Sequence, residues 1–189
     1  MTAAVFLDKD GTLIDDVPYN VDPDRITLTA HAGEALSLLR AAGYRLFIVS
    51  NQSGVARGLF AEAALEGVWR RIETLLAPWR VVIDGVYWCP HHPEGTVPSY
   101  SHDCDCRKPQ PGMLLRAASE HGIALSRSWM IGDILNDVEA GHRAGCAAAL
   151  IDNGNETEWL MSPMRRPEVT APNLLVAAQA ICAQGRRCA

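Results

Sequence analysis

Close to its amino-terminal end the chain reads AAVFLD at residues 3–8 and continues with KDGT at residues 9–12. The apolar run has the length of a buried strand and stops at an acid, and RLFIVSN at residues 45–51 repeats that shape with polar residues at its end. Between these runs, apolar residues recur at helical spacing from Gly33 to Gly43, and the second glycine suits a helix end. This stretch therefore predicts a strand, a helix and a second strand.

The same alternation continues along the chain. The sequence predicts further helices near 61–77, 111–121, 136–144 and 173–184, and strands near 81–88, 128–132 and 147–151. A loop rich in Cys and His fills 89–107, and 152–172, with three prolines and no clear period, predicts a surface excursion. Alternation of this kind predicts an α/β fold with a doubly wound, mainly parallel sheet, whose ligand site lies at the carboxyl ends of the strands.

Length, composition and charge exclude several classes of protein. With 189 residues, 48% hydrophobic and 21% charged, we expect one globular domain over residues 1–189. A net charge of −5 without a block of Lys or Arg argues against a nucleic-acid partner. The first residues have no basic start followed by a long apolar run, so we expect neither a signal peptide nor a membrane partner. We therefore expect a cytoplasmic protein, and a monomer.

Two pairs of acids follow predicted strands. Asp8 and Asp10 lie two residues apart, and a buried like-charge pair is costly unless a cation or a proton neutralises it. A solvated acidic turn would explain these two residues as well, but a calcium loop would not, because its twelfth position needs Glu and here it is Tyr19. Asp133 and Asp137 end another strand and begin a helix, where the helix dipole alone favours an acid.

In combination, these patterns resemble the four motifs of haloacid dehalogenase-like phosphatases. The matching residues are D-x-D-G-T at 8–12, Ser50-Asn51, Lys108, and G-D-x-x-x-D at 132–137. The resemblance implies that Asp8 is a nucleophile that forms an aspartyl phosphate, and that Asp10 is the general acid and base. No large insertion separates Asp10 from Ser50, so no separate cap domain is expected.

The resemblance also implies how phosphate and metal are held. Mg²⁺ would be bound by the Asp8 side chain, the Asp10 backbone carbonyl and Asp133, with Asp137 supporting that shell. Ser50 and Lys108 would hold the oxygens of the phosphoryl group, where hydrogen bonds and positive charge match the charge of the transition state.

The Cys/His loop predicts a second metal site. Cys89, Cys104 and Cys106 supply three thiolates, and soft sulfur ligands select Zn²⁺ over Mg²⁺. His91 is the predicted fourth ligand, with His92 and His102 as substitutes, and surface cysteines without a metal are the alternative. Four protein ligands leave no position for water, so the zinc would be structural.

The same loop narrows the resemblance. CPHHPEG at 89–95, CDCRKP at 104–109, PGM at 111–113 and NQSGVARG at 51–58 resemble the D-glycero-D-manno-heptose 1,7-bisphosphate 7-phosphatases. The histidinol-phosphate phosphatases are the nearest relatives, with a shorter loop. The resemblance implies removal of the sugar 7-phosphate, or else hydrolysis of histidinol phosphate or another small sugar phosphate. The substrate contacts that it implies are Asp16, Val17, Pro18, Tyr19, Ser50, Asn51, Gln52, Ser53, Arg107 and Lys108.

Two features leave alternatives open. The Arg107 fork suits a second anion or a sugar hydroxyl, but a surface arginine beside a metal loop has the same sequence signature. Position 134 is Ile134, where the heptose enzymes generally have a lysine. A zinc-loop binding module with inert carboxylates, and phosphoryl transfer to an acceptor other than water, are the competing functional hypotheses.

Overall fold

The computed structural model describes residues 2–185 and contains one sheet of parallel strands in the order β3-β2-β1-β4-β5-β6. The strands are β1 (Ala4–Leu7), β2 (Arg45–Asn51), β3 (Gly85–Cys89), β4 (Trp129–Gly132), β5 (Ala147–Ile151) and β6 (Val169–Ala171). The chain builds one half of the sheet from β1 outward to β3 and then returns to place β4 on the other side of β1. The predicted doubly wound α/β class is confirmed, and the strand order reverses between β1 and β4, where such folds bind ligands.

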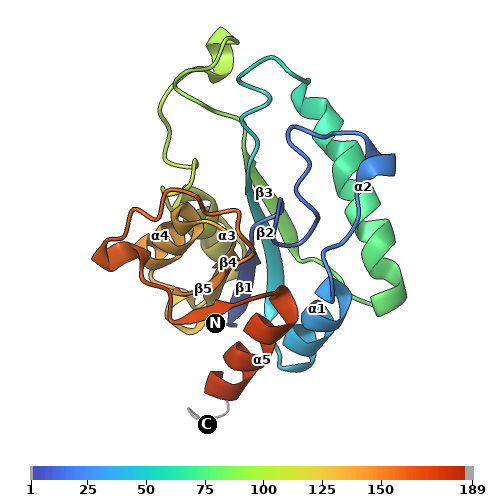
Figure 1. Ribbon diagram of the computed structural model, residues 1–189, viewed down its shortest axis with the longest axis vertical. Helices are drawn as coiled ribbons and strands as arrows, with labels where there is room; N and C mark the ends of the chain where they lie inside the picture. Colours follow the sequence, from blue (N-terminus) through green and yellow to red (C-terminus); the bar gives the residue numbers. More distant parts are fainter. Residues whose placement is uncertain (1, 186–189) are drawn as a thin grey trace.

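Helices cover both faces of this sheet (Figure 1). They are α1 (Ala32–Ala41), α2 (Leu65–Leu76), α3 (Gly112–His121), α4 (Leu135–Ala144) and α5 (Leu174–Gly185). Side chains alternate between the faces of a strand, so Val5 and Leu7 of β1 pack in the cluster that includes α1, α2 and α5. Ala4 and Phe6 pack on the opposite face with α3 and α4. The central strand is thus buried on both sides, as its unbroken apolar run predicts.

The strand predicted at 81–88 begins later, at Gly85. Asp84 explains the difference, because its carboxylate accepts the backbone N–H of Leu46 at 2.9 Å and pairs with Arg40 at 2.6 Å and Arg45 at 3.0 Å. The backbone N–H of Leu46 on β2 is therefore bonded to the Asp84 side chain, at the place where a longer β3 would have continued the strand pairing.

The predicted excursion at 152–172 is also corrected. It contains β6, which extends the sheet beside β5. Between Asp10 and Ser50 the structure has a short 3-10 turn at Pro23–Arg25 and α1, in addition to β2, which agrees with the predicted lack of a large cap. That residues 1–189 form a single domain stays a prediction.

Candidate active site

The carboxyl ends of three neighbouring strands meet at the point where the strand order reverses. Asp8 follows β1, Ser50 lies near the end of β2, and Asp133 follows β4. The backbone N–H of Asp8 donates to the carbonyl of Ile131 on β4 at 2.9 Å, so the strand pairing continues up to the predicted nucleophile. The parallel sheet therefore brings together side chains that lie more than 120 residues apart in the sequence.

Asp8, Asp133 and Asp137 form a buried carboxylate cluster. One oxygen from each lies within 4.8 Å of one from each of the others, a grouping that could hold a metal ion. Gly132 permits this approach, because a Cβ added there would lie 2.2 Å from Cβ of Asp137. Carboxylate oxygens are the ligands that Mg²⁺ prefers. Asp137 thus belongs to the cluster, and its predicted role in supporting the metal shell stays a prediction.

Lys108 reaches into this cluster from the chain segment that precedes α3. Its side chain is 2% exposed, and its ammonium group pairs with both Asp8 and, at 2.6 Å, Asp137. It also donates to the carbonyl oxygen of Val49 at 2.9 Å. Asn51 fixes the backbone of Lys108 from both sides, donating to its carbonyl at 3.1 Å and accepting from its N–H at 3.0 Å. Lys108 is therefore held in contact with the predicted nucleophile.

The charges in the cluster do not balance. Three carboxylates face the single ammonium group of Lys108 among the described residues, so two negative charges stay uncompensated in a buried place when all three acids are ionised. Burial raises the pKa of Asp8 well above 3.8, and the neighbouring acids add to this while Lys108 opposes it. Burial, followed by repulsion from Asp137, raises the pKa of Asp133 to about 6. Burial lowers the pKa of Lys108, but the two acids outweigh it and leave the pKa raised. A divalent cation fits this imbalance.

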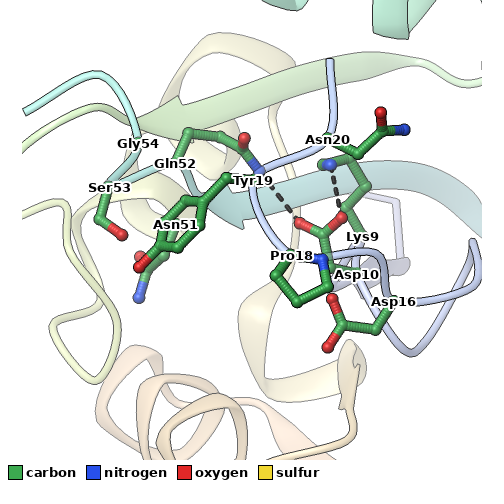
Figure 2. Close-up of a pocket in the computed structure, with 10 residues that line it drawn as sticks. All are labelled: Lys9, Asp10, Asp16, Pro18, Tyr19, Asn20, Asn51, Gln52, Ser53 and Gly54. Carbon is green, nitrogen blue, oxygen red and sulfur yellow. Dashed lines mark hydrogen bonds and ion pairs between the residues drawn. The ribbon is translucent and has the colours of Figure 1, made fainter. Parts of the chain in front are cut away.

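Asp10 is not part of the carboxylate cluster and lines an open pocket of about 250 Å³ (Figure 2). One oxygen of its carboxylate pairs with Lys9 at 2.6 Å, and the other accepts from Nε2 of Gln52 at 3.1 Å. The same amide group also donates to Oγ of Ser50 at 2.8 Å. Gln52 therefore connects the end of β2 to the predicted general acid and fixes the direction of its carboxylate.

Six of the predicted substrate contacts line this pocket. They are Asp16, Pro18, Tyr19, Asn51, Gln52 and Ser53, and Lys9, Asp10, Asn20 and Gly54 complete the lining. The lining does not include Val17, Ser50, Arg107 or Lys108, of which Ser50 and Lys108 lie deeper, against Gln52 and the carboxylate cluster. Burial, with repulsion from Asp10, raises the pKa of Asp16, which adds a second acid to the rim.

The four predicted zinc ligands converge in a second cluster. The Sγ atoms of Cys89, Cys104 and Cys106 lie 3.1 to 3.5 Å apart, and Nδ1 of His91 lies 3.3 Å from Sγ of Cys106. These spacings suit four ligands around one small ion with metal–sulfur bonds of about 2.3 Å. The His102 ring contacts the His91 ring in a tilted arrangement, with 4.3 Å between the ring centres. Burial raises the pKa of Cys106 to about 11, so without a cation this thiol keeps its proton, and a metal ion would have to displace it.

Comparison with known proteins agrees with this geometry. A family model described as HAD-hydrolase-like matches residues 105–177. The D-glycero-beta-D-manno-heptose-1,7-bisphosphate 7-phosphatase of Photorhabdus laumondii is 46% identical over 137 residues, which cover 72% of this chain and 73% of the relative. The chain belongs to the haloacid dehalogenase-like phosphatases. The Escherichia coli phosphatase of the same name is 38% identical over 170 residues, covering 85% of this chain and 89% of that family member.

A solved structure extends the likeness to the whole fold. The D,D-heptose 1,7-bisphosphate phosphatase from B. bronchiseptica, complexed with magnesium and phosphate, superimposes with a TM-score of 0.78 at 28% identity. The alignment covers 96% of this haloacid dehalogenase-like phosphatase and 99% of that chain. None of the helices within residues 2–185 is long and apolar enough to cross a membrane.

The sequence analysis of this haloacid dehalogenase-like phosphatase missed residues that follow β5. Asn155 donates to Oδ2 of Asp133 at 2.6 Å, and Asn153 donates to the carbonyl of Gly11 at 2.8 Å. Both lie in the region predicted as a surface excursion. The rule that functional residues follow the strands of a parallel sheet would have found them, had it been applied to the end of β5. Lys9, which pairs with Asp10, was missed because the motif leaves its position open.

Proposed function

We propose that this chain removes the 7-phosphate of D-glycero-D-manno-heptose 1,7-bisphosphate through an aspartyl phosphate on Asp8. The observation that carries the chemistry is the buried carboxylate of Asp8, in contact with Lys108 and grouped with Asp133 and Asp137. The substrate is inferred from the names of the relatives, one of which is similar over 85% of this chain.

Each residue then has a defined task. An oxygen of Asp8 attacks phosphorus, and the bond from phosphorus to the sugar oxygen breaks while Asp10 supplies that oxygen with a proton. Asp10 next takes a proton from water, whose oxygen bonds to phosphorus while the bond from phosphorus to the Asp8 oxygen breaks, which releases inorganic phosphate and regenerates the Asp8 carboxylate. Lys108 and Ser50 hold the phosphoryl oxygens, and their positions beside Asp8 and Gln52 support that role. Gln52 and Lys9 keep the Asp10 carboxylate directed into the pocket.

Magnesium is the proposed catalytic metal. Two uncompensated negative charges in the carboxylate cluster, and oxygen atoms as donors, fit this ion. The proposed ligands are the side chains of Asp8 and Asp133 and the backbone carbonyl of Asp10, with Asp137 adjoining them. When bound, Mg²⁺ supplies positive charge that offsets the repulsion between Asp8 and an incoming phosphate.

A structural zinc ion is proposed for the Cys/His cluster. The donor set of three sulfur atoms and one imidazole nitrogen fits zinc, and it provides all four ligands of a closed site. Cys89 is the last residue of β3, so this ion would attach the loop 89–107 directly to the sheet. A loop with few apolar residues gains in this way the rigidity that packing does not provide.

The pocket beside Asp10 is the proposed place for the sugar. Asp16, Tyr19, Asn51 and Ser53 present carboxylate, hydroxyl and amide groups that suit sugar hydroxyls. Pro18 lines the same pocket, and Val17, which precedes it in the chain, is kept as a substrate contact that the resemblance implies. Arg107 is proposed to bind the second anion, and Ile134 replaces the lysine that the heptose enzymes generally have, so the second anion would depend more strongly on Arg107.

Substrate-panel kinetics test this function. The purified protein with Mg²⁺ is assayed for phosphate release from heptose 1,7-bisphosphate, other sugar bisphosphates, sugar monophosphates and histidinol phosphate. We expect the highest kcat/KM for the heptose bisphosphate, with heptose 1-phosphate as product. Best turnover of histidinol phosphate would reject the heptose substrate and keep the mechanism.

Asp8→Asn tests the mechanism separately from the substrate. We expect loss of turnover and of acid-stable labelling from a substrate labelled with ³²P, because the variant lacks the nucleophile. Asp24→Asn, which changes an exposed acid outside the site, is the matched control and should keep full activity. An unchanged Asp8→Asn variant would favour the binding-module hypothesis, and label passed to a second organic acceptor would favour phosphoryl transfer.

A further inference from the structure

We infer that Asn155 is a positioning residue that orients the Asp133 carboxylate for magnesium. The inference rests on the proposed function, because it takes Asp133 as a ligand of that ion. It concerns the turn at residues 152–156, which follows β5 and which we name the β5 turn. None of the four sequence motifs includes this turn.

The β5 turn contacts three separate parts of the site. The amide group of Asn155 donates to Oδ2 of Asp133 at 2.6 Å, and the amide of Asn153 donates to the carbonyl of Gly11 at 2.8 Å. Glu156 accepts the backbone N–H of Leu135 at 2.7 Å, at the start of the helix that carries Asp137. One short segment thus holds the loop after β1, the acid after β4 and the first turn of α4 in fixed relation.

Hydrogen bonds within the β5 turn hold Asn155 in place beside Asp133. The backbone N–H of Asn155 donates to Oδ1 of Asn153 at 3.1 Å, which fixes the two asparagines relative to each other. Glu156 also accepts the N–H of Glu158 at 2.9 Å, so the segment after the turn is fixed too. Although Asn155 is exposed to solvent, its backbone N–H and its side-chain amide both have hydrogen-bond partners, in Asn153 and Asp133.

Gly11 supplies independent evidence that the fold allows the close contact between Asn155 and Asp133. A Cβ at position 11 would lie 2.1 Å from Oδ2 of Asp133 and 2.4 Å from Nδ2 of Asn155. The missing side chain therefore leaves the space in which the amide and the carboxylate meet. The φ of +76° at Gly11 places the turn there and also favours glycine.

The consequence for the metal follows from the chemistry of carboxylates. A free carboxylate can rotate about its bond to Cβ, and a donor that occupies one oxygen fixes the rotation. The side-chain donors to Asp133 are Asn155 at Oδ2 and, at the longer distance of 3.5 Å, the hydroxyl of Thr12 at Oδ1. Groups that hold a metal ligand in this way typically change metal affinity by about 10- to 100-fold when they are removed.

Direct titration of Mg²⁺ tests the inference. The Kd is measured by calorimetry without substrate, and by competition with Mn²⁺ followed by electron paramagnetic resonance. For Asn155→Ala we expect a Kd raised by about 10- to 100-fold. Thr157→Ala, which changes an exposed side chain just after the β5 turn, is the control and should stay within about twofold of the parent. Asn155→Ala with a Kd within about twofold of the parent would overturn the inference.

Two further measurements separate positioning from folding and from the substrate. Raising the Mg²⁺ concentration should restore most of kcat in Asn155→Ala, whereas a merely structural defect would leave kcat low at saturating Mg²⁺ and would overturn the inference. A parent protein that binds Mg²⁺ but hydrolyses no heptose bisphosphate would reject the substrate and leave this test intact. A parent that binds no Mg²⁺ would reject both the magnesium site and the role of Asn155.

Discussion

Removal of the Lys108 charge should destabilise the protein strongly, in a manner that depends on pH. Lys108→Met keeps most of the volume of the side chain but leaves Asp8 and Asp137 buried without their ion pair. Breaking a buried pair from one side typically costs about 3–5 kcal/mol, because the remaining charge is uncompensated. For a chain of this size that corresponds to a fall in Tm of roughly 6–20 °C.

The direction of the pH dependence follows from the raised pKa of Asp8. Loss of Lys108 removes the attraction that lowers this pKa, so the pKa rises further above 3.8. An acid with a raised pKa in the folded state is destabilising while it is ionised, and this cost disappears as the pH falls below the folded pKa. We therefore expect the deficit in unfolding free energy to be largest near pH 8 and clearly smaller near pH 5.

Urea denaturation at the two pH values, in buffer without added magnesium, measures this deficit. Lys9→Met is a matched control, since Lys9 is also a buried lysine that pairs with an acid at 2.6 Å. Its partner Asp10 has a side chain that is 35% exposed, so water can replace the ammonium group, and we expect a loss of at most about 1 kcal/mol. A Lys108→Met variant within about 1 kcal/mol of the parent at pH 8 would refute the reasoning.

Three other changes test the site. A strong zinc chelator should release one metal ion per chain, make three more thiols reactive and lower Tm, because Cys89, Cys104 and Cys106 lose the ion that they share. Unchanged thiol reactivity would reject the zinc site. Gly132→Ala should lower kcat by more than about tenfold, because its Cβ would displace Asp137. The control Gly122→Ala lies in open space with φ +63° and should cost only about 1–2 kcal/mol of stability, so equal kcat values for the two variants would contradict the reasoning. Gln52→Leu should lower kcat by about 10- to 100-fold, with the folded state intact by circular dichroism, and a change in KM alone would show that Gln52 only binds substrate.

The sequence predicts the centre of the site well because strand ends are easy to locate. The apolar run before Asp8 and the one before Asp133 are short and unbroken, so the residue at which each strand stops is visible in the sequence. Parallel pairing then requires these acids to lie side by side. The contact between Lys108 and Asp8, across 100 residues, could be inferred only from the order of the motifs.

The remaining errors have local physical causes. The late start of β3 depends on the contacts of the Asp84 side chain with Leu46, Arg40 and Arg45, which no periodicity reveals. The three residues of β6 are too few to produce an alternating pattern, and prolines flank them. The β5 turn looks polar and irregular in the sequence because its asparagines bind backbone and side-chain groups far along the chain.

The pairing of β2 with β3 places Asn51 opposite Cys89, and the N–H of Gln52 donates to the Cys89 carbonyl at 2.8 Å. A residue of the Cys/His cluster is therefore one hydrogen bond away from the side chain that directs Asp10. Loss of the proposed zinc ion should accordingly disturb the direction of the Asp10 carboxylate and slow turnover before the protein unfolds.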